Sequence, residues 1–175
     1  GVEGVVSEKR QGDASGRLRR RYKGLSADDY RKSVERTITS GVPGAAYSDL
    51  KTSDAHDEIE WSAKFASPRF AQIPQAQLMI FRAGVLRMVD LPRFSEKSRK
   101  LPVVMDADAL LETATVKIPE GFKVDELPDS FKLDSPYGRV EAAWKHEGNQ
   151  VTFTRTLALN SLTVPAAEYP ALKKF

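Results

Sequence analysis

Hydrophobic and polar residues alternate along much of this chain with the period of two that is typical of β-strands. The clearest alternation lies at residues 56–65, where every second side chain is apolar: Ile59, Trp61, Ala63 and Phe65. The segment 77–82 is apolar on both faces, which predicts a strand in the covered centre of a sheet. The segment 85–89 is expected to continue this strand or to pair with it across Ala83–Gly84. The first half of the chain therefore predicts several strands.

Two more strands are predicted at residues 2–10 and 17–25, on either side of the Gly- and Ser-containing turn 11–16. In the second of them, alternation places a row of cations on one face: Arg17, Arg19, Arg21 and Lys23. This row is the first candidate binding surface.

One amphipathic helix is predicted over about residues 26–40. Ser26 is a typical N-cap, and Asp29 stands three residues later as in a capping box. Tyr30, Val34 and Ile38 recur every four residues and form one apolar stripe. Gly41 is placed to end the helix in the left-handed conformation.

The last third of the chain predicts strands near 112–118, 122–126, 130–133, 139–147 and 150–159. A two-residue turn at Gly148–Asn149 joins the last two and sets their register. In that register Trp144 lies opposite Phe153, Val140 opposite Leu157, His146 opposite Val151 and Ala142 opposite Arg155. The tail 164–175 begins like a helix that Pro170 confines to one side.

These elements predict an α+β, β-rich fold with an antiparallel, sandwich-like arrangement of two sheets and the helix packed on the N-terminal one. The polar segment 90–102, bracketed by prolines, predicts a boundary. Residues 1–90 would form the N-terminal sheet plus helix, and residues 91–175 a C-terminal sandwich-like part. One continuous domain is the alternative.

Composition agrees with a soluble globular protein, since 41% of residues are hydrophobic and 29% are charged. No apolar run reaches the roughly 20 residues that a membrane-spanning helix needs. The absence of cysteine excludes disulfides, thiolate metal sites and cysteine nucleophiles within these residues. The opening at Gly1, without an initiating Met, is typical of a piece of a larger protein.

The basic row has two interpretations. Residues 1–25 hold seven Lys or Arg and three Asp or Glu, whereas residues 26–60 hold four and eight, so the sequence favours cations that pair with acidic neighbours. The alternative is a contact with a polyanion, a glycan or a cell-wall component. Nucleic acid is disfavoured, because only Tyr22 is available for stacking and it projects from the other face.

Arg155 falls on the apolar face of the C-terminal hairpin and must find a carboxylate or carbonyl groups there. We expect a structural ion pair between the sheets; an anchor for a ligand carboxylate or another domain is the alternative. His56, Glu58 and Glu60 share a strand face, but successive members stand about 6.6 Å apart, which favours a solvated face over a metal site.

Sequence signals of catalysis are missing: the chain has no HExxH, no GxSxG, no Walker loop, no GxGxxG and no calcium loop. His146 lies near the hairpin tip and fits a partly exposed packing residue. We therefore expect a protein that is not an enzyme and that uses no cofactor and no metal.

The second half of the chain resembles a known family. The motifs that carry the resemblance are Arg99–Val103, Ile118–Gly121, Leu127–Pro128, Gly138, the strand around Arg155, and Pro165 with Glu168–Tyr169 leading into Leu172 and Phe175. Residues 95–175 are similar to the C-terminal β-rich domain of unknown function of bacterial exported transglutaminase-like proteins. Residues 16–30 are similar to the segment that follows the core of those proteins.

The resemblance implies an accessory or interaction domain downstream of a papain-like transglutaminase core, in the periplasm or at the cell surface. The implied partners are that core, another envelope protein or a cell-wall polymer. Such a core uses a Cys–His–Asp triad, and this chain has no cysteine, so no catalytic residue is carried over.

Overall fold

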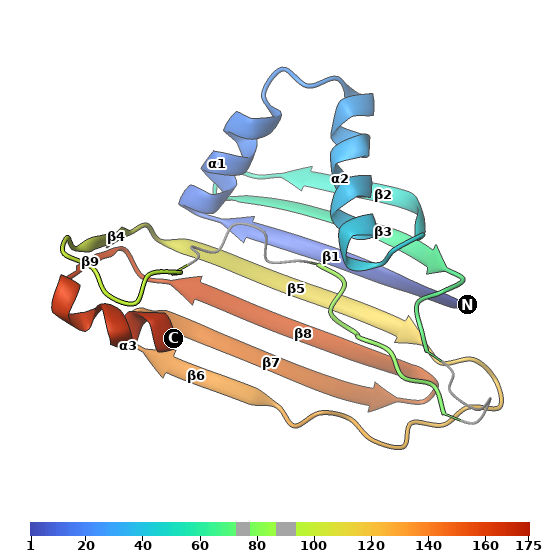
Figure 1. The fold of residues 1–175 in the computed structure, drawn as a ribbon. Helices are drawn as coiled ribbons and strands as arrows, with labels where there is room; N and C mark the ends of the chain where they lie inside the picture. Colours follow the sequence, from blue (N-terminus) through green and yellow to red (C-terminus); the bar gives the residue numbers. More distant parts are fainter. Residues whose placement is uncertain (73–77, 87–93) are drawn as a thin grey trace.

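The computed structural model describes residues 1–72, 78–86 and 94–175. Their main element is a seven-stranded antiparallel sheet in the order β2-β3-β1-β5-β8-β7-β6 (Figure 1). The strands are β1 (Val2–Gln11), β2 (Ala46–Asp54), β3 (Glu58–Ser67), β5 (Asp108–Lys117), β6 (Phe131–Ser135), β7 (Gly138–Glu147) and β8 (Gln150–Leu159). A second, two-stranded sheet pairs β4 (Val103–Met105) with β9 (Leu162–Val164).

The prediction of a β-rich fold is confirmed, but the described strands are distributed between the two sheets differently from the prediction. β1 from the N-terminal half pairs with both β3 and β5, so the two halves share the large sheet. The other sheet consists of two three-residue strands. A sandwich-like arrangement and the division near residue 90 stay predictions.

The predicted strand 17–25 is wrong, because residues Asp13–Tyr22 form helix α1. Gly12, at φ +57°, breaks the chain direction at the end of β1. Beyond it, Arg20 interrupts the strict alternation, and Arg and Leu are strong helix formers. The chain therefore has helices besides the one expected.

Helix α2 (Ala27–Gly41) is confirmed with its cap and its apolar stripe. The Ser26 hydroxyl accepts a hydrogen bond from the Asp29 amide at 3.1 Å. Val34 and Ile38 are buried, and Tyr30 packs at the margin of the same core, which includes Val6 and Trp61. The helix thus packs on the N-terminal strands, as expected.

Gly41 acts differently from its predicted role as a left-handed stop. It is the last helical residue, and the positive φ of +73° belongs to Gly44 instead. A Cβ at Gly41 would lie 1.6 Å from the Val85 carbonyl oxygen. Glycine is therefore required there by the close approach of residues 83–86, which we call the strap.

The strands predicted at 77–82 and 85–89 are not formed in the described residues 78–86, which include the strap. Described residues 78–86 form only an isolated bridge between Ile80 and Gln72. Leu78 and Ile80 are about half exposed, so this segment is not a central strand, whereas Val85 and Leu86 are buried. Residues 77 and 87–89 of the two predictions, and 90–93 of the predicted linker, lie outside the described residues.

The C-terminal predictions are largely confirmed. β7 and β8 pair in the predicted register, with Trp144 opposite Phe153 and Ala142 opposite Arg155, and Gly148 has φ +58°. Residues 122–126 form no strand. The tail forms a short 3₁₀ turn η2 (Ala166–Glu168) and helix α3 (Tyr169–Lys174), with Pro170 in its first turn.

We expect Gly41→Ala to destabilise the protein, because a new Cβ overlaps backbone that cannot move without displacing buried Val85. The expected loss in the free energy of unfolding is about 1–3 kcal/mol or more, measured by urea unfolding.

Gly16→Ala is the matched control. Gly16 also lies in a helix, but its Cβ would meet only the tip of Arg20 at 3.6 Å. We expect a gain of about 0.5–1 kcal/mol from helix propensity. Equal losses in both variants would contradict the close approach at Gly41.

Candidate functional site

The residues of the predicted basic row lie on helix α1 and at its end instead of on a strand, and Arg17 and Arg19 join the helix to other elements. Arg19 forms an ion pair with Asp54 at 2.7 Å and donates to the carbonyls of Ala55 and Glu58. These bonds of the Arg19 guanidinium connect α1 to the turn between β2 and β3. Arg19 is thus a bridge between elements.

Arg17 faces the opposite direction and pairs with Asp108 of β5 at 2.9 Å. Together with Arg10 and Arg21 it lines a cavity of about 360 Å³ between α1 and β4, whose floor includes Met105. Lys23 is exposed at the end of α1.

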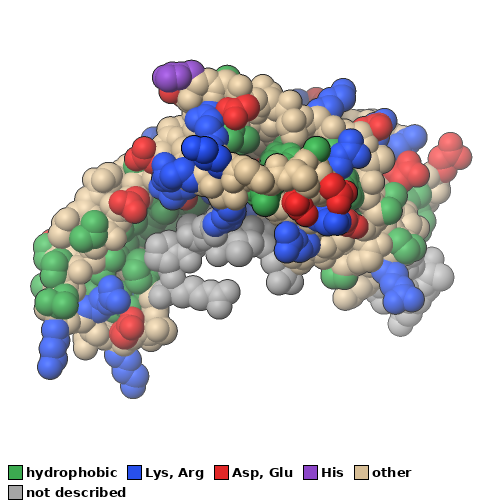
Figure 2. Space-filling view, turned by 90° about the horizontal axis from the view of Figure 1, so that it is seen from above, with side chains coloured by type: hydrophobic (Ala, Val, Ile, Leu, Met, Phe, Trp, Pro, Cys, Tyr) green, Lys and Arg blue, Asp and Glu red, His purple; other side chains and the backbone are tan. Residues whose placement is uncertain are grey.

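Lys and Arg side chains gather over α1, with Asp and Glu side chains among and around them (Figure 2). The acidic neighbours that the sequence favoured as partners are therefore present, with Asp54 and Asp108 as the actual ones. A binding role for Arg17, Arg19, Arg21 and Lys23 stays a prediction.

Arg155 meets a carboxylate that lies on the neighbouring strand. Glu112 stands directly opposite it in the β5–β8 register, and Arg155 Nη2 lies 2.5 Å from Glu112 Oε2. The pair therefore lies within one sheet, and the prediction of an ion pair between the sheets is wrong in this respect. Glu112 is fully buried, and the Arg155 side chain is 20% exposed.

This ion pair holds the strap by its backbone. Glu112 Oε1 accepts hydrogen bonds from the amides of Val85 at 3.0 Å and Leu86 at 2.7 Å. Arg155 Nη2 donates to the Leu86 carbonyl at 2.7 Å. The strap has no strand partner at Val85 or Leu86, so these two side chains satisfy the polar groups that a strand would have satisfied.

Burial raises the pKa of Glu112 above its ordinary value, although the strap amides and the Arg155 guanidinium oppose the shift. Desolvation is the largest cause because the carboxylate has no contact with water. The ionised form therefore depends on its hydrogen bonds and on Arg155.

A second buried carboxylate lies beside the first. Glu8 of β1 stands opposite Glu112 on one side and Trp61 on the other. It accepts from Trp61 Nε1 at 2.9 Å and from Arg10 Nε at 2.5 Å. The covered face of the sheet thus carries two acids and two arginines in adjacent strands.

Sequence reasoning missed both acids, although a signal was present. Glu8 shares its strand parity with Val2 and Val6, and Glu112 shares its parity with Ala114 and Val116. A charged residue in the middle of an apolar face predicts a buried ion pair, as it did for Arg155.

His56 is fully exposed, and its nearest acid is Asp57 at 3.8 Å. It precedes β3, so it does not share a strand face with Glu58 and Glu60. Within residues 1–72, 78–86 and 94–175, no three His, Asp or Glu side chains are grouped to hold a metal ion. His146 is exposed at the hairpin tip.

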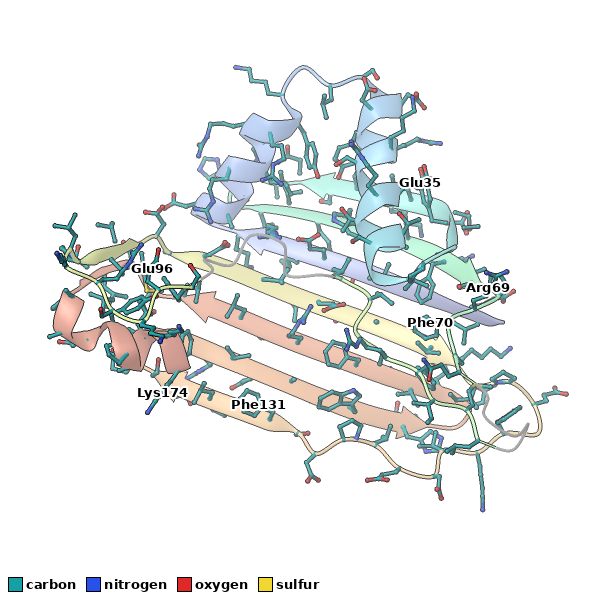
Figure 3. All side chains as sticks on the ribbon, in the orientation of Figure 1. Glu35, Arg69, Phe70, Glu96, Phe131 and Lys174 are labelled. Atoms are coloured by element: carbon teal, nitrogen blue, oxygen red, sulfur yellow. The ribbon has the colours of Figure 1, made fainter. Side chains whose placement is uncertain are left out.

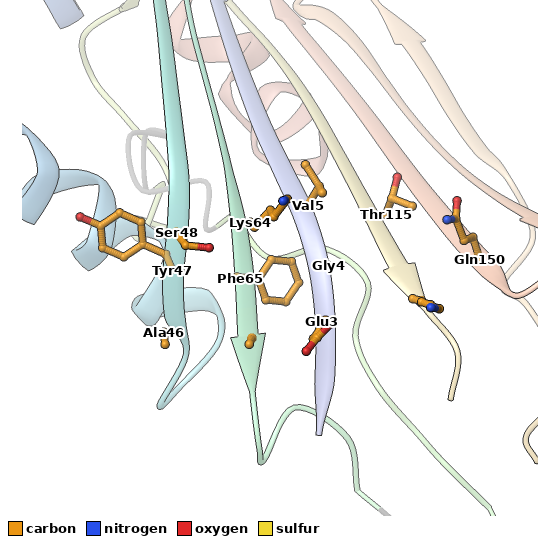
Figure 4. A pocket seen from close by; sticks show the side chains of 12 residues that line it. Glu3, Gly4, Val5, Ala46, Tyr47, Ser48, Lys64, Phe65, Thr115 and Gln150 are labelled. Carbon is orange, nitrogen blue, oxygen red and sulfur yellow. The ribbon is translucent and has the colours of Figure 1, made fainter. Parts of the chain in front are cut away.

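The other face of the large sheet is open, since no described element crosses it. Its centre carries short side chains, which are Val5, Ser7, Thr113, Thr115, Thr152, Thr154, Thr156 and Ala143. A hollow of about 440 Å³ lies at one end of this open face, between Lys64, Val5 and Thr115 (Figure 4).

Among the residues that the structure describes, no helix has the length and apolar character of a membrane span.

We expect Arg155→Met to destabilise the protein by about 3–5 kcal/mol at neutral pH, because it leaves the buried Glu112 carboxylate without its counter-charge. The double variant Arg155→Met/Glu112→Gln should recover most of this loss, since Gln keeps an acceptor for the strap amides. Chemical unfolding of the unchanged protein, the two single variants and the double variant gives the coupling free energy between Arg155 and Glu112. Additive losses would show that the two side chains act separately.

Stability should also depend on pH through Glu112. Its pKa is raised in the folded state, so its contribution is fully present below the ordinary value of 4.5 and is lost as pH rises through the raised value. Glu112→Gln removes this term, and its stability relative to the unchanged protein should therefore increase from acidic to neutral pH. A difference independent of pH would contradict a raised pKa.

Comparison with known families places the C-terminal part of the chain. Residues 77–175 match a domain of unknown function with a solved structure, DUF3858. The matched range contains the strap, Glu112, Arg155 and the strands from β4 to β9. No curated protein matches the chain, and no solved structure matches it. Since the match covers more than half of the 175 residues, the chain belongs to the DUF3858 family of domains of unknown function.

Proposed function

We propose that this chain is a non-catalytic interaction domain that docks against another domain through the open face of its large sheet. The observation that carries the proposal is the contrast between the two faces. Helices α1 and α2 and the strap cover one face, whereas no described element lies on the other (Figure 1). On the covered face Glu8 pairs with Arg10 and Glu112 with Arg155, and the second pair also bonds to the strap.

Side-chain chemistry of the open face suits docking. Long charged side chains lose much rotamer freedom when a partner covers them, whereas Thr, Ala and Val lose little. The centre of this face consists of the second kind, and Val5 and Leu111 are 45% and 38% exposed. Charged residues such as Lys64, Lys117 and Lys145 lie around it. A centre without charged side chains, surrounded by charged ones, agrees with the depletion of charged residues at the centre of protein interfaces.

The partner that we propose is a transglutaminase-like core that precedes this domain in an exported bacterial protein. This part of the proposal rests on the resemblance of residues 95–175 and 16–30. It would place the domain in the periplasm or at the cell surface. The alternative, a polyanion- or glycan-binding module built on α1, has less support because Arg17 and Arg19 already bond to Asp108 and Asp54.

Binding in trans tests the proposal. The segment of the parent gene product that precedes Gly1 is produced separately and titrated with this chain by calorimetry. We expect saturable binding that Thr154→Arg weakens at least tenfold, about 1.4 kcal/mol, because a long cation then stands at the centre of the open face.

Glu35→Arg is the matched control, since Glu35 is exposed on α2, away from the open face (Figure 3). It should leave the affinity unchanged. Unchanged melting temperatures would show that both variants fold. An absent upstream core, no binding, or equal weakening by the two variants would each overturn the proposal.

A further inference from the structure

We propose that two copies of this chain associate through their β6 edges, in an antiparallel pair that joins two seven-stranded sheets. This inference does not depend on the proposed function, because it concerns an edge of the sheet and not its open face. β6 is the last strand of the sheet order, and no described residue pairs with its outer side.

The two edges of the sheet differ. At the β2 edge the register shifts between Ser48 and Lys51, and Asp49 has φ +53°, so a bulge interrupts the strand. Bulges of this kind hinder pairing with another chain. The β6 edge pairs regularly along all five residues with β7. It also exposes an aromatic residue, Phe131, which is 50% exposed.

β6 is complementary to itself. If two copies pair antiparallel about Leu133, Lys132 of each copy lies opposite Asp134 of the other. Within its own copy Lys132 already pairs with Glu141 and Asp134 with Arg139, so the second copy would extend an existing row of alternating charges across the edge. Opposite charges directly across an antiparallel pair stabilise it. Phe131 and Leu133 lie on the other face of the strand. There Leu133 would lie opposite Leu133 of the second copy, and Phe131 would lie opposite Ser135 and diagonally beside Leu133.

The register between β6 and β7 supports Leu133 as the centre of the proposed pair. β6 and β7 are joined by a two-residue turn, with Ser135 opposite Gly138. Backbone groups of alternate residues point to opposite sides of an antiparallel strand. When the pair that closes the turn bonds inside the hairpin, the N–H and C=O groups of Asp134 and Lys132 point outward. They are then available to the second copy on both sides of Leu133.

Charged residues beyond the two ends of β6 are also complementary between two antiparallel copies. Lys174 of α3 lies near the end of β6, whereas Phe131 marks its start (Figure 3). The segment before that start is acidic and exposed, with Asp125, Glu126 and Asp129. Antiparallel pairing brings the α3 end of one copy to the acidic segment of the other. A second copy of this chain is therefore the partner that fits the edge.

Sedimentation velocity over a range of concentrations tests the association. Two five-residue strands form a small interface, so we expect a weak dimer that dissociates on dilution. Lys132→Glu and Asp134→Lys should each weaken it at least tenfold, because each places like charges opposite one another. The fourfold variant Lys132→Glu/Asp134→Lys/Arg139→Glu/Glu141→Lys restores opposite charges both across the proposed axis and within each β6–β7 hairpin, and it should restore the dimer.

Controls separate this edge from other surfaces. Lys132 and Asp134 are more than half exposed, but each is paired with β7 in its own copy, so circular dichroism and the melting temperature of every variant check that it folds. Lys51→Glu, on the β2 edge, should leave the dimer intact. A chain that stays monomeric at its highest soluble concentration, or a dimer that responds to Lys51→Glu and not to the β6 exchanges, would overturn the proposal.

Crosslinking supplies an independent measurement. The chain has no cysteine, so Leu133→Cys introduces a single thiol that faces its own copy across the proposed axis. Directly opposed residues in antiparallel pairs lie about 4.5–5.5 Å apart at Cα, within the span of a disulfide. We expect a disulfide-linked dimer under mild oxidation, and none for Lys51→Cys. Equal crosslinking of both variants would count against the β6 pair.

Discussion

The arrangement of this domain depends on one buried carboxylate. Glu112 lies in the middle of a covered sheet face, where an ionised group is costly unless it is fully bonded. Two strap amides and the Arg155 guanidinium supply those bonds. The strap in turn brings Val85 against Gly41 at the end of α2. The Glu112–Arg155 pair thus connects the strap to the sheet, and the strap contacts the end of the helix.

Local signals in the sequence were sufficient for some elements. The β7–β8 hairpin followed from a two-residue turn and alternation, and α2 followed from its cap and stripe, because both depend on residues close together in the chain. Helix α1 was not predicted, since the alternation of Arg17, Arg19 and Arg21 suggested a strand. Whether such a short cationic segment forms a strand or a helix depends on the neighbours that bond to it.

Long-range contacts explain the remaining differences. The strap is apolar like a central strand, but its backbone is satisfied by side chains from β5 and β8, which no local pattern can show. For the candidate site, Arg155 was expected to form an ion pair, and that was correct. Its partner was not identified, because the register between β5 and β8 joins residues 43 positions apart.

β1 has a consequence for how the chain reaches its folded state. Its two neighbours, β3 and β5, lie on opposite sides of it, and β5 ends only at Lys117. During synthesis from the N-terminus, one edge of β1 must stay unpaired until β5 has emerged. Pairings between such distant segments raise the contact order and slow folding. A nascent chain of this kind is exposed to wrong strand pairing for longer than one built from hairpins alone.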